Sequence, residues 1–316
     1  MISYFVGLDV SKATVDVAFF PANYPQFQVS NDPDGFAQLI ACLHELEVER
    51  ILLEATGGYE RALLRALRLE DLNVFRVNPK RARDYAKSMG KFAKTDRIDA
   101  RMLAKFARDF EEVPQIEPNQ ARDELGELIK LRGNLVKSRD SERRRIKQTT
   151  CATAIASYTD HISYLNDKIK TLEKAIEEAS NVLDQEKASR LRSVKGIGAI
   201  ACGTLMASLP ELGTVTGRKI AALAGLAPYN NDSGKKSGPR SIEGGRYAVR
   251  CAIYMSTWSM VRHDPEVKAE YEALRARGKR AKVAVVACMR KLLVRLNAML
   301  RDGSKWKEPK SQVPAT

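Results

Sequence analysis

Two carboxylates lie three residues apart in the stretch Lys94-Thr95-Asp96-Arg97-Ile98-Asp99, where the sequence predicts the start of a helix. Residues three apart share one face of a helix, so the side chains of Asp96 and Asp99 are expected to point the same way. Carboxylate oxygens are ligands that suit Mg²⁺, and bound Mg²⁺ can promote phosphodiester chemistry. This spacing therefore predicts half of a metal site, and the other half must come from elsewhere in the chain.

Two further acids occupy positions where a charge needs a reason. Asp9 lies inside the apolar run Val6-Gly7-Leu8-Asp9-Val10, where a charge is costly unless it is paired or binds a metal. Glu54 ends the run Ile51-Leu52-Leu53-Glu54, at a strand terminus of the kind where sites on α/β sheets cluster. Together with Asp96 and Asp99 they predict a site for two Mg²⁺ ions roughly 3.5–4 Å apart.

Each acid also has a purely structural explanation. Asp96 and Asp99 would be favoured in a first helical turn by the helix dipole, with Thr95 as the cap. Asp9 could close a hairpin with Ser11, and Glu54 could pair with a Lys or Arg. The joint pattern favours the metal site. Three other acids have less distinctive positions: Asp16, Glu60 and Asp84.

The charge of the chain is strongly positive and unevenly distributed. The net charge is +14, and the isoelectric point is about 9.6. Residues 1–112 carry 16 basic and 17 acidic side chains, whereas residues 113–316 carry 37 basic and 22 acidic ones. Because Lys and Arg neutralise phosphates and release counterions, the second part is expected to bind nucleic acid.

Cysteine use and hydropathy indicate a reducing, aqueous compartment. The five cysteines show no CxxC spacing and there are only three histidines, so neither a zinc site nor a disulfide framework is predicted. The chain shows no signal peptide and no apolar run of membrane-spanning length. We expect a cytoplasmic bacterial protein, associated with the nucleoid and not with a membrane.

Hydrophobic periodicity predicts an α/β domain followed by helices. Strands are expected at residues 4–10, 14–20, 27–30, 50–54 and 73–77, with helices at 34–47 and 59–69. Pro114 and Pro118 then interrupt the pattern. We predict a catalytic domain at 1–113, a helical coiled-coil segment at 119–190, a mostly helical C-terminal domain at 191–300 and a flexible tail at 301–316.

The predicted coiled-coil segment has a regular apolar seam. A 3-4 repeat runs through Ile162, Leu165, Ile169, Leu172, Ile176 and Leu183, with Ala179 filling one gap. The pattern fits an intramolecular helical hairpin and a dimerising coiled coil about equally well.

Two features of the C-terminal domain point to phosphate chemistry. Lys195-Gly196-Ile197-Gly198 is typical of the turn of a helix-hairpin-helix, whose backbone amides can bind a phosphate, although a plain helix–helix turn fits too. In the loop at 228–246, three serines stand among the cations Lys235, Lys236, Arg240 and Arg246; they are Ser233, Ser237 and Ser241. A positioned serine hydroxyl can attack phosphorus, and cations stabilise the developing charge. Composition does not choose among the three serines, and a flexible, solvated basic loop is the simpler explanation.

The sequence resembles a known family over about residues 4–300. Gly7-Leu8-Asp9-Val10, Glu54-Ala55-Thr56-Gly57 and Lys94-Thr95-Asp96-Arg97-Ile98-Asp99-Ala100 match the DEDD motifs of a group of bacterial insertion-sequence transposases. This group includes Piv-type invertases and bridge-RNA-guided recombinases. Leu223-Ala224-Gly225-Leu226-Ala227-Pro228 and Asp232-Ser233-Gly234 follow its C-terminal transposase domain in order.

The resemblance implies a RuvC-like, RNase H-type N-terminal domain with metal-binding roles for Asp9, Glu54, Asp96 and Asp99. It implies that Ser233 is the nucleophile that forms a covalent serine–DNA intermediate. It further implies action on donor and target double-stranded DNA, a structured guide RNA, and dimers that pair into a tetramer with a shared active site.

We therefore predict a DNA transposase or site-specific recombinase. One alternative is a Holliday-junction-resolvase-like nuclease, which would hydrolyse DNA without a serine. Another is a non-catalytic architectural protein, in which the basic part binds nucleic acid and the acids have no chemical role.

Overall fold

The computed structural model describes residues 2–90, 96–110, 119–230, 232–233, 236–238 and 240–306; for residues 96–98, 232–233 and 236–237 it describes the backbone alone. The chain divides into two compact units, Met1–Pro118 and Asn119–Thr316, called unit 1 and unit 2 below. Of the flexible tail predicted at residues 301–316, the part from residue 307 onward lies outside the described residues.

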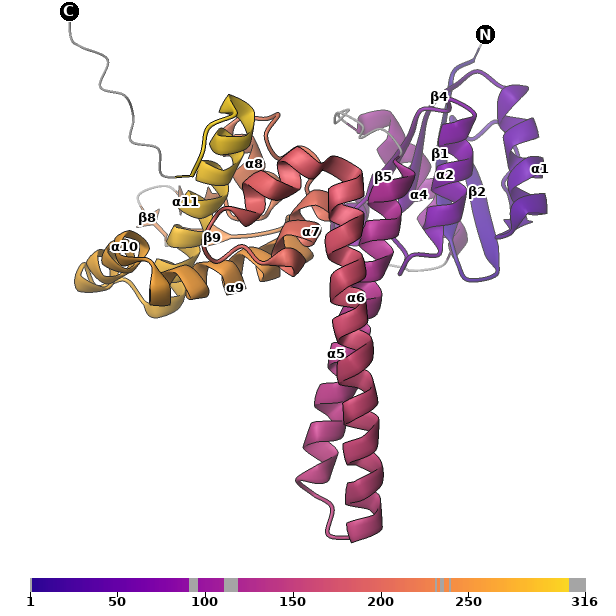
Figure 1. The fold of residues 1–316 in the computed structure, drawn as a ribbon. Coiled ribbons are helices and arrows are strands. Elements are labelled where there is room, and N and C mark those ends of the chain that lie inside the picture. The colour runs from indigo at the N-terminus through magenta and orange to yellow at the C-terminus, as the bar shows by residue number, and fades with distance from the viewer. Residues whose placement is uncertain are drawn as a thin grey trace, which may run out of the picture. The chain divides into compact units, whose positions relative to one another are not determined.

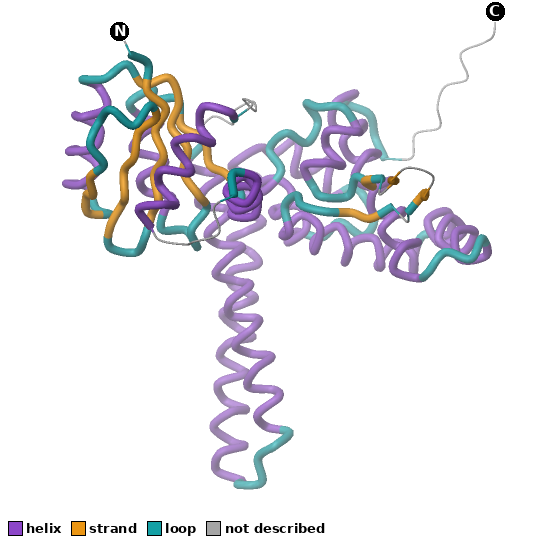
Figure 2. Tube along the Cα trace, turned by 180° about the vertical axis from the view of Figure 1, so that it is seen from behind, coloured by secondary structure: helices purple, strands orange, loops and turns teal. Residues whose placement is uncertain are grey.

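Unit 1 is built on one mixed, five-stranded sheet (Figure 2). The strand order is β3-β2-β1-β4-β5. The first three strands in sequence pair antiparallel, and β4 and β5 continue the sheet parallel to β1. The expected strands are confirmed to within a residue or two; they are β1 (Tyr4–Val10), β2 (Thr14–Phe20), β3 (Phe27–Ser30), β4 (Val48–Glu54) and β5 (Val74–Val77).

Helices cover both faces of this sheet because the side chains of each strand alternate between the faces. One face packs Val6 and Leu8 of β1 against α1 (Pro33–His44) and α2 (Glu60–Leu69). The opposite face packs against α4 (Asp96–Asp109) through Leu103 and small residues. Burying a leucine fully is worth about 1.5–3 kcal/mol, so both layers hold the sheet firmly.

One helix of unit 1 was not expected from the sequence. Helix α3 (Pro79–Ser88) follows β5 directly, with Asn78 as its cap: the Asn78 side chain accepts a hydrogen bond of 2.8 Å from the amide of Lys80. Pro79 in the first turn favours a helix start. Because α3 has no buried residue, it lacks the apolar periodicity that reveals the other helices.

Unit 2 begins with a long antiparallel hairpin made of α5 (Gln120–Ile146) and α6 (Ala152–Arg192), which lie side by side in Figure 1. Arg132 of α5 binds Glu173 of α6 at 2.6 Å, and Arg139 lies 3.5 Å from the side-chain oxygen of Asn166. Leu165, Ile169 and Ile176 of the apolar seam are buried within this single chain, as in the first of the two arrangements that its pattern allowed. Its use between two chains stays a prediction.

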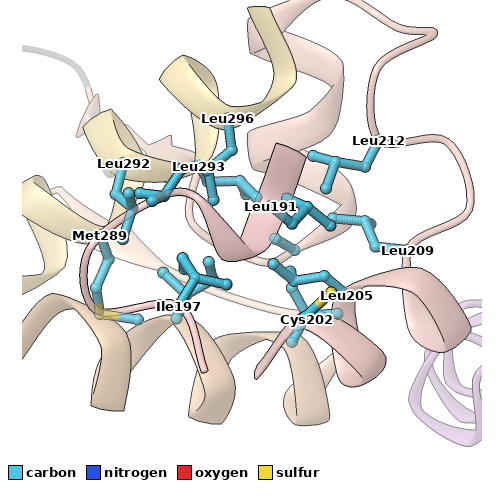
Figure 3. Packing of buried hydrophobic residues seen from close by; sticks show 14 of the residues in the cluster. Leu191, Ile197, Cys202, Leu205, Leu209, Leu212, Met289, Leu292, Leu293 and Leu296 are labelled. Carbon is cyan, nitrogen blue, oxygen red and sulfur yellow. The ribbon is translucent and has the colours of Figure 1, made fainter. Parts of the chain in front are cut away.

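The remaining helices of unit 2 pack on the end of this hairpin. Leu191 of α6, Leu205 of α7 and Leu293 of α11 point into one apolar core, shown in Figure 3. The short strands were not expected, because the sequence predicted only a loop at residues 228–246. The elements are α7 (Ala199–Ser208), α8 (Gly217–Leu223), α9 (Tyr247–His263), α10 (Pro265–Ala276), α11 (Ala281–Asp302), and strands β6 (Pro228–Tyr229), β7 (Asp232–Ser233), β8 (Lys236–Ser237) and β9 (Ser241–Ile242).

Among the described residues, no helix combines the length and the apolar character that crossing a membrane would require.

Candidate active site

Asp9 and Glu54 lie at the same edge of the sheet, on neighbouring parallel strands. Leu8 of β1 pairs with Leu53 of β4, so the next residues along the two strands are Asp9 and Glu54. Parallel strands are about 4.8 Å apart, which brings these two half-buried acids side by side. Alternation along each strand turns both side chains toward the face that α4 covers.

The backbone of helix α4 packs directly against β1 at Gly7. A Cβ atom at Gly7 would lie 2.1 Å from the carbonyl oxygen of Ala100 and 2.2 Å from the amide nitrogen of Ala104. Real Cβ atoms essentially never come so close to backbone atoms. Glycine at position 7 is therefore what allows the first turns of α4 to lie against the strand that carries Asp9.

The direction of α4 places its beginning at the acidic edge. Ala100 lies against Gly7, whereas the carbonyl of Ala107 accepts a hydrogen bond of 2.7 Å from Arg50. Arg50 pairs with Phe5, two residues further from the Asp9 end of β1. Helix α4 thus runs opposite to β1, and its N-terminal turn lies toward Asp9.

Asp96 and Asp99 come from that N-terminal turn. Asp99 is half-buried, and helical spacing puts it on the stripe of Leu103, which packs on the sheet. Asp96 is four residues before Ala100 and lies on the same side of the helix, but its side chain lies outside the described residues. The backbone therefore brings all four predicted acids to one edge of unit 1.

The donor set suits Mg²⁺ by its chemistry, because it consists of four carboxylates. Among the described side chains, no group of three or more His, Cys, Asp or Glu residues is already arranged to hold a metal ion, and Asp96 is not among those side chains. The metal-binding role of the four acids stays a prediction.

A fifth carboxylate lies beside this edge. Asp16 of β2 pairs directly with Asp9 of β1, is only 5% exposed, and accepts a hydrogen bond of 3.0 Å from the side chain of Gln28. Like charges directly opposite each other on two strands destabilise a sheet. A cation bound near Asp9 and Asp16 would therefore relieve the repulsion between the two carboxylates. The pairing of Asp9 with Asp16 could have been inferred from the sequence, because the turn between residues 10 and 14 sets the register of β1 and β2.

The loop after Glu54 is organised by a buried acid that the sequence did not single out. Glu60 is 2% exposed, and its carboxylate accepts hydrogen bonds from the amides of Thr56 at 3.1 Å and Gly58 at 2.9 Å. Arg76 completes the arrangement at 3.3 Å. Glu60 therefore fixes the backbone immediately after Glu54. The sequence had given Glu60 no distinctive role, but in the structure it organises this loop.

In unit 2, Ser233 lies on a small pair of nested ribbons. Strand β7 pairs with β8 so that Ser233 is opposite Lys236, and β6 pairs with β9 outside them. The backbone thus places the predicted nucleophile beside a predicted cation. The side chains of Ser233, Lys236 and Ser237 lie outside the described residues, as does Lys235 entirely.

Glycines close the base of these ribbons. Gly225 and Gly245 have φ angles of +68° and +66°, which side chains rarely adopt. A Cβ atom on Gly245 would lie 2.0 Å from the amide nitrogen of Gly225. The two chain segments that enter and leave the ribbons therefore touch backbone to backbone, which only glycine permits.

Arg246 and Arg250 fasten the same closure. Arg246 binds both carboxylate oxygens of Glu211, at 2.5 and 2.6 Å, and the carbonyl of Ser208 at 3.1 Å. Arg250 donates a hydrogen bond to the carbonyl of Gly244. Burial alone would raise the pKa of Glu211, but the hydrogen bonds and charge of Arg246 hold the pKa of that carboxyl below its ordinary value. Arg246 was predicted to contact nucleic acid; that role stays a prediction, and its guanidinium already binds Glu211.

The Lys195-Gly196-Ile197-Gly198 segment forms a turn between α6 and α7. Gly196 has a φ of +97°, and Gly198 is the residue before α7, which has no side-chain cap among the described contacts. The side chain of Lys195 is exposed, as is that of Arg240 on the ribbon side. The backbone amides at the start of α7 fit the predicted phosphate contact, and this role also stays a prediction.

Comparison with known proteins places this arrangement among the transposases. A transposase family model, that of the IS110 DEDD transposases, matches residues 6–150, and a second model, described as transposase IS116/IS110/IS902 family, matches residues 188–272. The chain belongs to the IS110 family of transposases, which are DNA-recombining enzymes.

Two kinds of curated relative support this assignment. The pilin gene-inverting proteins of Moraxella bovis and Moraxella lacunata are each 29% identical over 315 residues, covering 94% of this chain and 96% of the relative. An uncharacterized 42 kDa protein of insertion element IS900 from Mycobacterium paratuberculosis is 32% identical over 161 residues, or 49% of this chain and 39% of that protein.

Proposed function

We propose that this protein is an insertion-sequence transposase or site-specific recombinase that cuts and rejoins double-stranded DNA through a serine–DNA covalent intermediate. The observation that carries this proposal is that Asp9 and Glu54 follow the paired residues Leu8 and Leu53 at one sheet edge, beneath a helix that begins with Asp96 and Asp99. The strand order and the position of the acids fit the RuvC-like fold that the resemblance implies.

In the proposed mechanism, the hydroxyl oxygen of Ser233 attacks a DNA phosphorus. An ester bond forms between serine and the phosphate, the bond to the leaving DNA oxygen breaks, and the serine proton passes to that oxygen or to water. Asp9, Glu54, Asp96 and Asp99 would hold Mg²⁺, which polarises the phosphoryl group and stabilises the leaving oxygen. Rejoining reverses the step with the DNA oxygen of another strand, and the ester conserves the bond energy in between.

Ser233 can be tested against its two neighbours. Ser233→Ala should abolish the protein–DNA adduct that survives denaturing electrophoresis, whereas Ser237→Ala and Ser241→Ala should keep it. If Ser233→Ala still cuts DNA in the presence of Mg²⁺, the resolvase-like nuclease replaces the recombinase. If none of the three substitutions changes the adduct, the serine mechanism is wrong.

The acids separate an enzyme from an architectural binder. Asp9→Asn and Asp99→Asn should retain DNA binding, since they remove negative charge, but should lose cutting and adduct formation by several orders of magnitude. Unchanged recombination in both variants would support the architectural alternative.

We further propose that acids of one protomer act with the serine of another, within dimers that pair into a tetramer. Mixing Ser233→Ala protein with Asp9→Asn protein should then restore part of the activity, because one intact site can form between the two variants. The absence of any restoration in verified mixed oligomers would place both groups in one chain.

A structured guide RNA is the last part of the proposal. The basic surplus of residues 113–316 supports an additional polyanion but does not identify it. Sequencing the RNA that copurifies with the protein should give one structured species from the flank of the element. Random fragments alone would argue against RNA guidance.

A further inference from the structure

Helix α9 carries a continuous apolar stripe on its outer side. We call Tyr247, Cys251, Tyr254, Met255 and Trp258 the α9 stripe; their three- and four-residue spacing puts them on one face. Tyr247 is 73% exposed, Met255 67% and Tyr254 40%. The opposite face of α9 is buried in the core of unit 2. A helix that is apolar on both sides is normally covered on both sides, so the stripe indicates a binding surface.

The rings of the stripe are held in place rather than left loose. Trp258 is half-buried and packs against Tyr271 of α10, with ring centroids 5.6 Å apart. Tyr254 meets Trp258 edge to face at 6.3 Å. The guanidinium of Arg250 lies 5.7 Å from the ring centroid of Tyr247. Ordered rings lose little entropy when a flat partner stacks on them.

The charge of helix α9 itself favours a polyanion, and on the neighbouring α10 the acids Glu270 and Glu272 already lie within ion-pair distance of cations. Helix α9 contains no Asp or Glu, although the chain has 39 acidic residues, and its cations include Arg250 and Arg262. Exposed aromatic rings between cations are the pattern by which proteins bind unpaired nucleic acid: bases stack on rings while phosphates meet the positive charges. An acidic or purely apolar protein partner would not need this combination.

The stripe also begins where the serine ribbons end. Tyr247 follows Gly245 and Arg246, the residues that close the ribbons carrying Ser233. We propose that the α9 stripe is a stacking platform for unpaired DNA bases, namely those of the strand that is released when Ser233 cuts. The source of the unpaired strand rests on the proposed function; the platform itself rests on the geometry of α9.

The test measures binding by the full-length protein without divalent metal, so that no cutting occurs. The probes are a fluorescently labelled single-stranded oligothymidylate, the corresponding duplex, and an oligouridylate RNA. Tyr254→Ala and Tyr247→Ala should each weaken single-strand binding about tenfold, as expected when one stacked base is lost, with little change for the duplex. Tyr254→Phe and Tyr247→Phe keep the rings and should bind like the wild type.

Two controls separate stacking from general damage. Tyr164→Ala removes a ring on α6 that is 56% exposed but lies outside the stripe, and it should leave all three affinities unchanged. Thermal melts of the Tyr254 and Tyr247 variants should match the wild type, because neither side chain belongs to the apolar core of unit 2. If Tyr247→Ala melts early through loss of its contact with Arg250, Tyr254→Ala alone decides the outcome.

Three results would overturn the platform. The alanine variants could bind single-stranded DNA like the wild type, lose duplex and single-strand affinity equally, or lose RNA affinity alone. A change of oligomeric state in light scattering, without a change in DNA affinity, would assign the stripe to a second copy of the chain. Failure of the serine–DNA adduct would refute the proposed mechanism but not this binding result.

Discussion

The two units position their reactive residues in different ways. In unit 1, Asp9, Glu54 and Asp99 project from regular strands and a helix, whose register and close packing fix where they lie. In unit 2, Ser233 lies on two-residue strands whose position depends on a glycine closure and on Arg246 and Arg250. The acids therefore depend on strand register and on the packing of α4 against the sheet, whereas the serine depends on a few contacts around short strands.

The largest effect is expected from Gly7→Ala, which forces the added methyl group against the backbone of α4. The helix must move by about 1 Å or more, and displacements of that size can reduce catalysis on the order of 100-fold. We expect loss of metal-dependent DNA cutting together with a lower melting temperature. A variant with normal activity would show that the packing of α4 on β1 does not set the geometry of the acids.

Gly245→Ala should affect the other unit. Its methyl group would collide with the backbone of Gly225 and would also strain a left-handed conformation, costing about 1–3 kcal/mol. We expect protein–DNA adduct formation to fall while metal binding by the acids, measured by calorimetry with Mg²⁺, stays unchanged. If both readouts fell together, the two reactive groups would not be positioned independently.

Acidification should weaken the serine closure through Glu211. Because the pKa of Glu211 in the folded protein lies below its ordinary value of 4.5, its ion pair stabilises the fold above that pH and is lost as the pH falls through the lowered pKa. Glu211→Gln should cost about 1–3 kcal/mol at neutral pH and flatten the acid limb of stability against pH. An unchanged acid limb in chemical denaturation would show that other carboxylates dominate.

Gly126→Ala gives the smallest effect and calibrates the other glycine substitutions. It lies inside α5 with no atom within 4 Å of an added Cβ, and it has ordinary backbone angles. Alanine there should stabilise the hairpin by about 0.5–1 kcal/mol without changing activity. A thermal melt and a cutting assay suffice, and an activity loss would mean that the hairpin itself participates in the reaction.

The sequence predicted the acidic edge better than the serine ribbons for a physical reason. Strand alternation and apolar runs mark Asp9 and Glu54 locally, and the sheet then aligns them. The role of Gly7 depends on a contact with Ala100, which is distant in the sequence and leaves no periodic signal. The contact between Arg246 and Glu211 spans 35 residues and is equally hidden.

Several elements were missed because they lack a periodic core face. Helix α3 buries no residue, and the two-residue strands are shorter than any pattern can reveal. Asp16 and Glu60 were set aside as ordinary acids. Their burial became evident only when the hairpin register and the loop after Glu54 were known.

The antiparallel hairpin of α5 and α6 has a consequence for how such proteins diverge. Its two helices are matched by contacts such as Arg132 with Glu173, and the chain returns close to where it left the core of unit 2. Equal numbers of turns can therefore be added to or removed from both helices without disturbing either reactive unit. The length of the hairpin can therefore change during evolution while the residues proposed to react keep their positions.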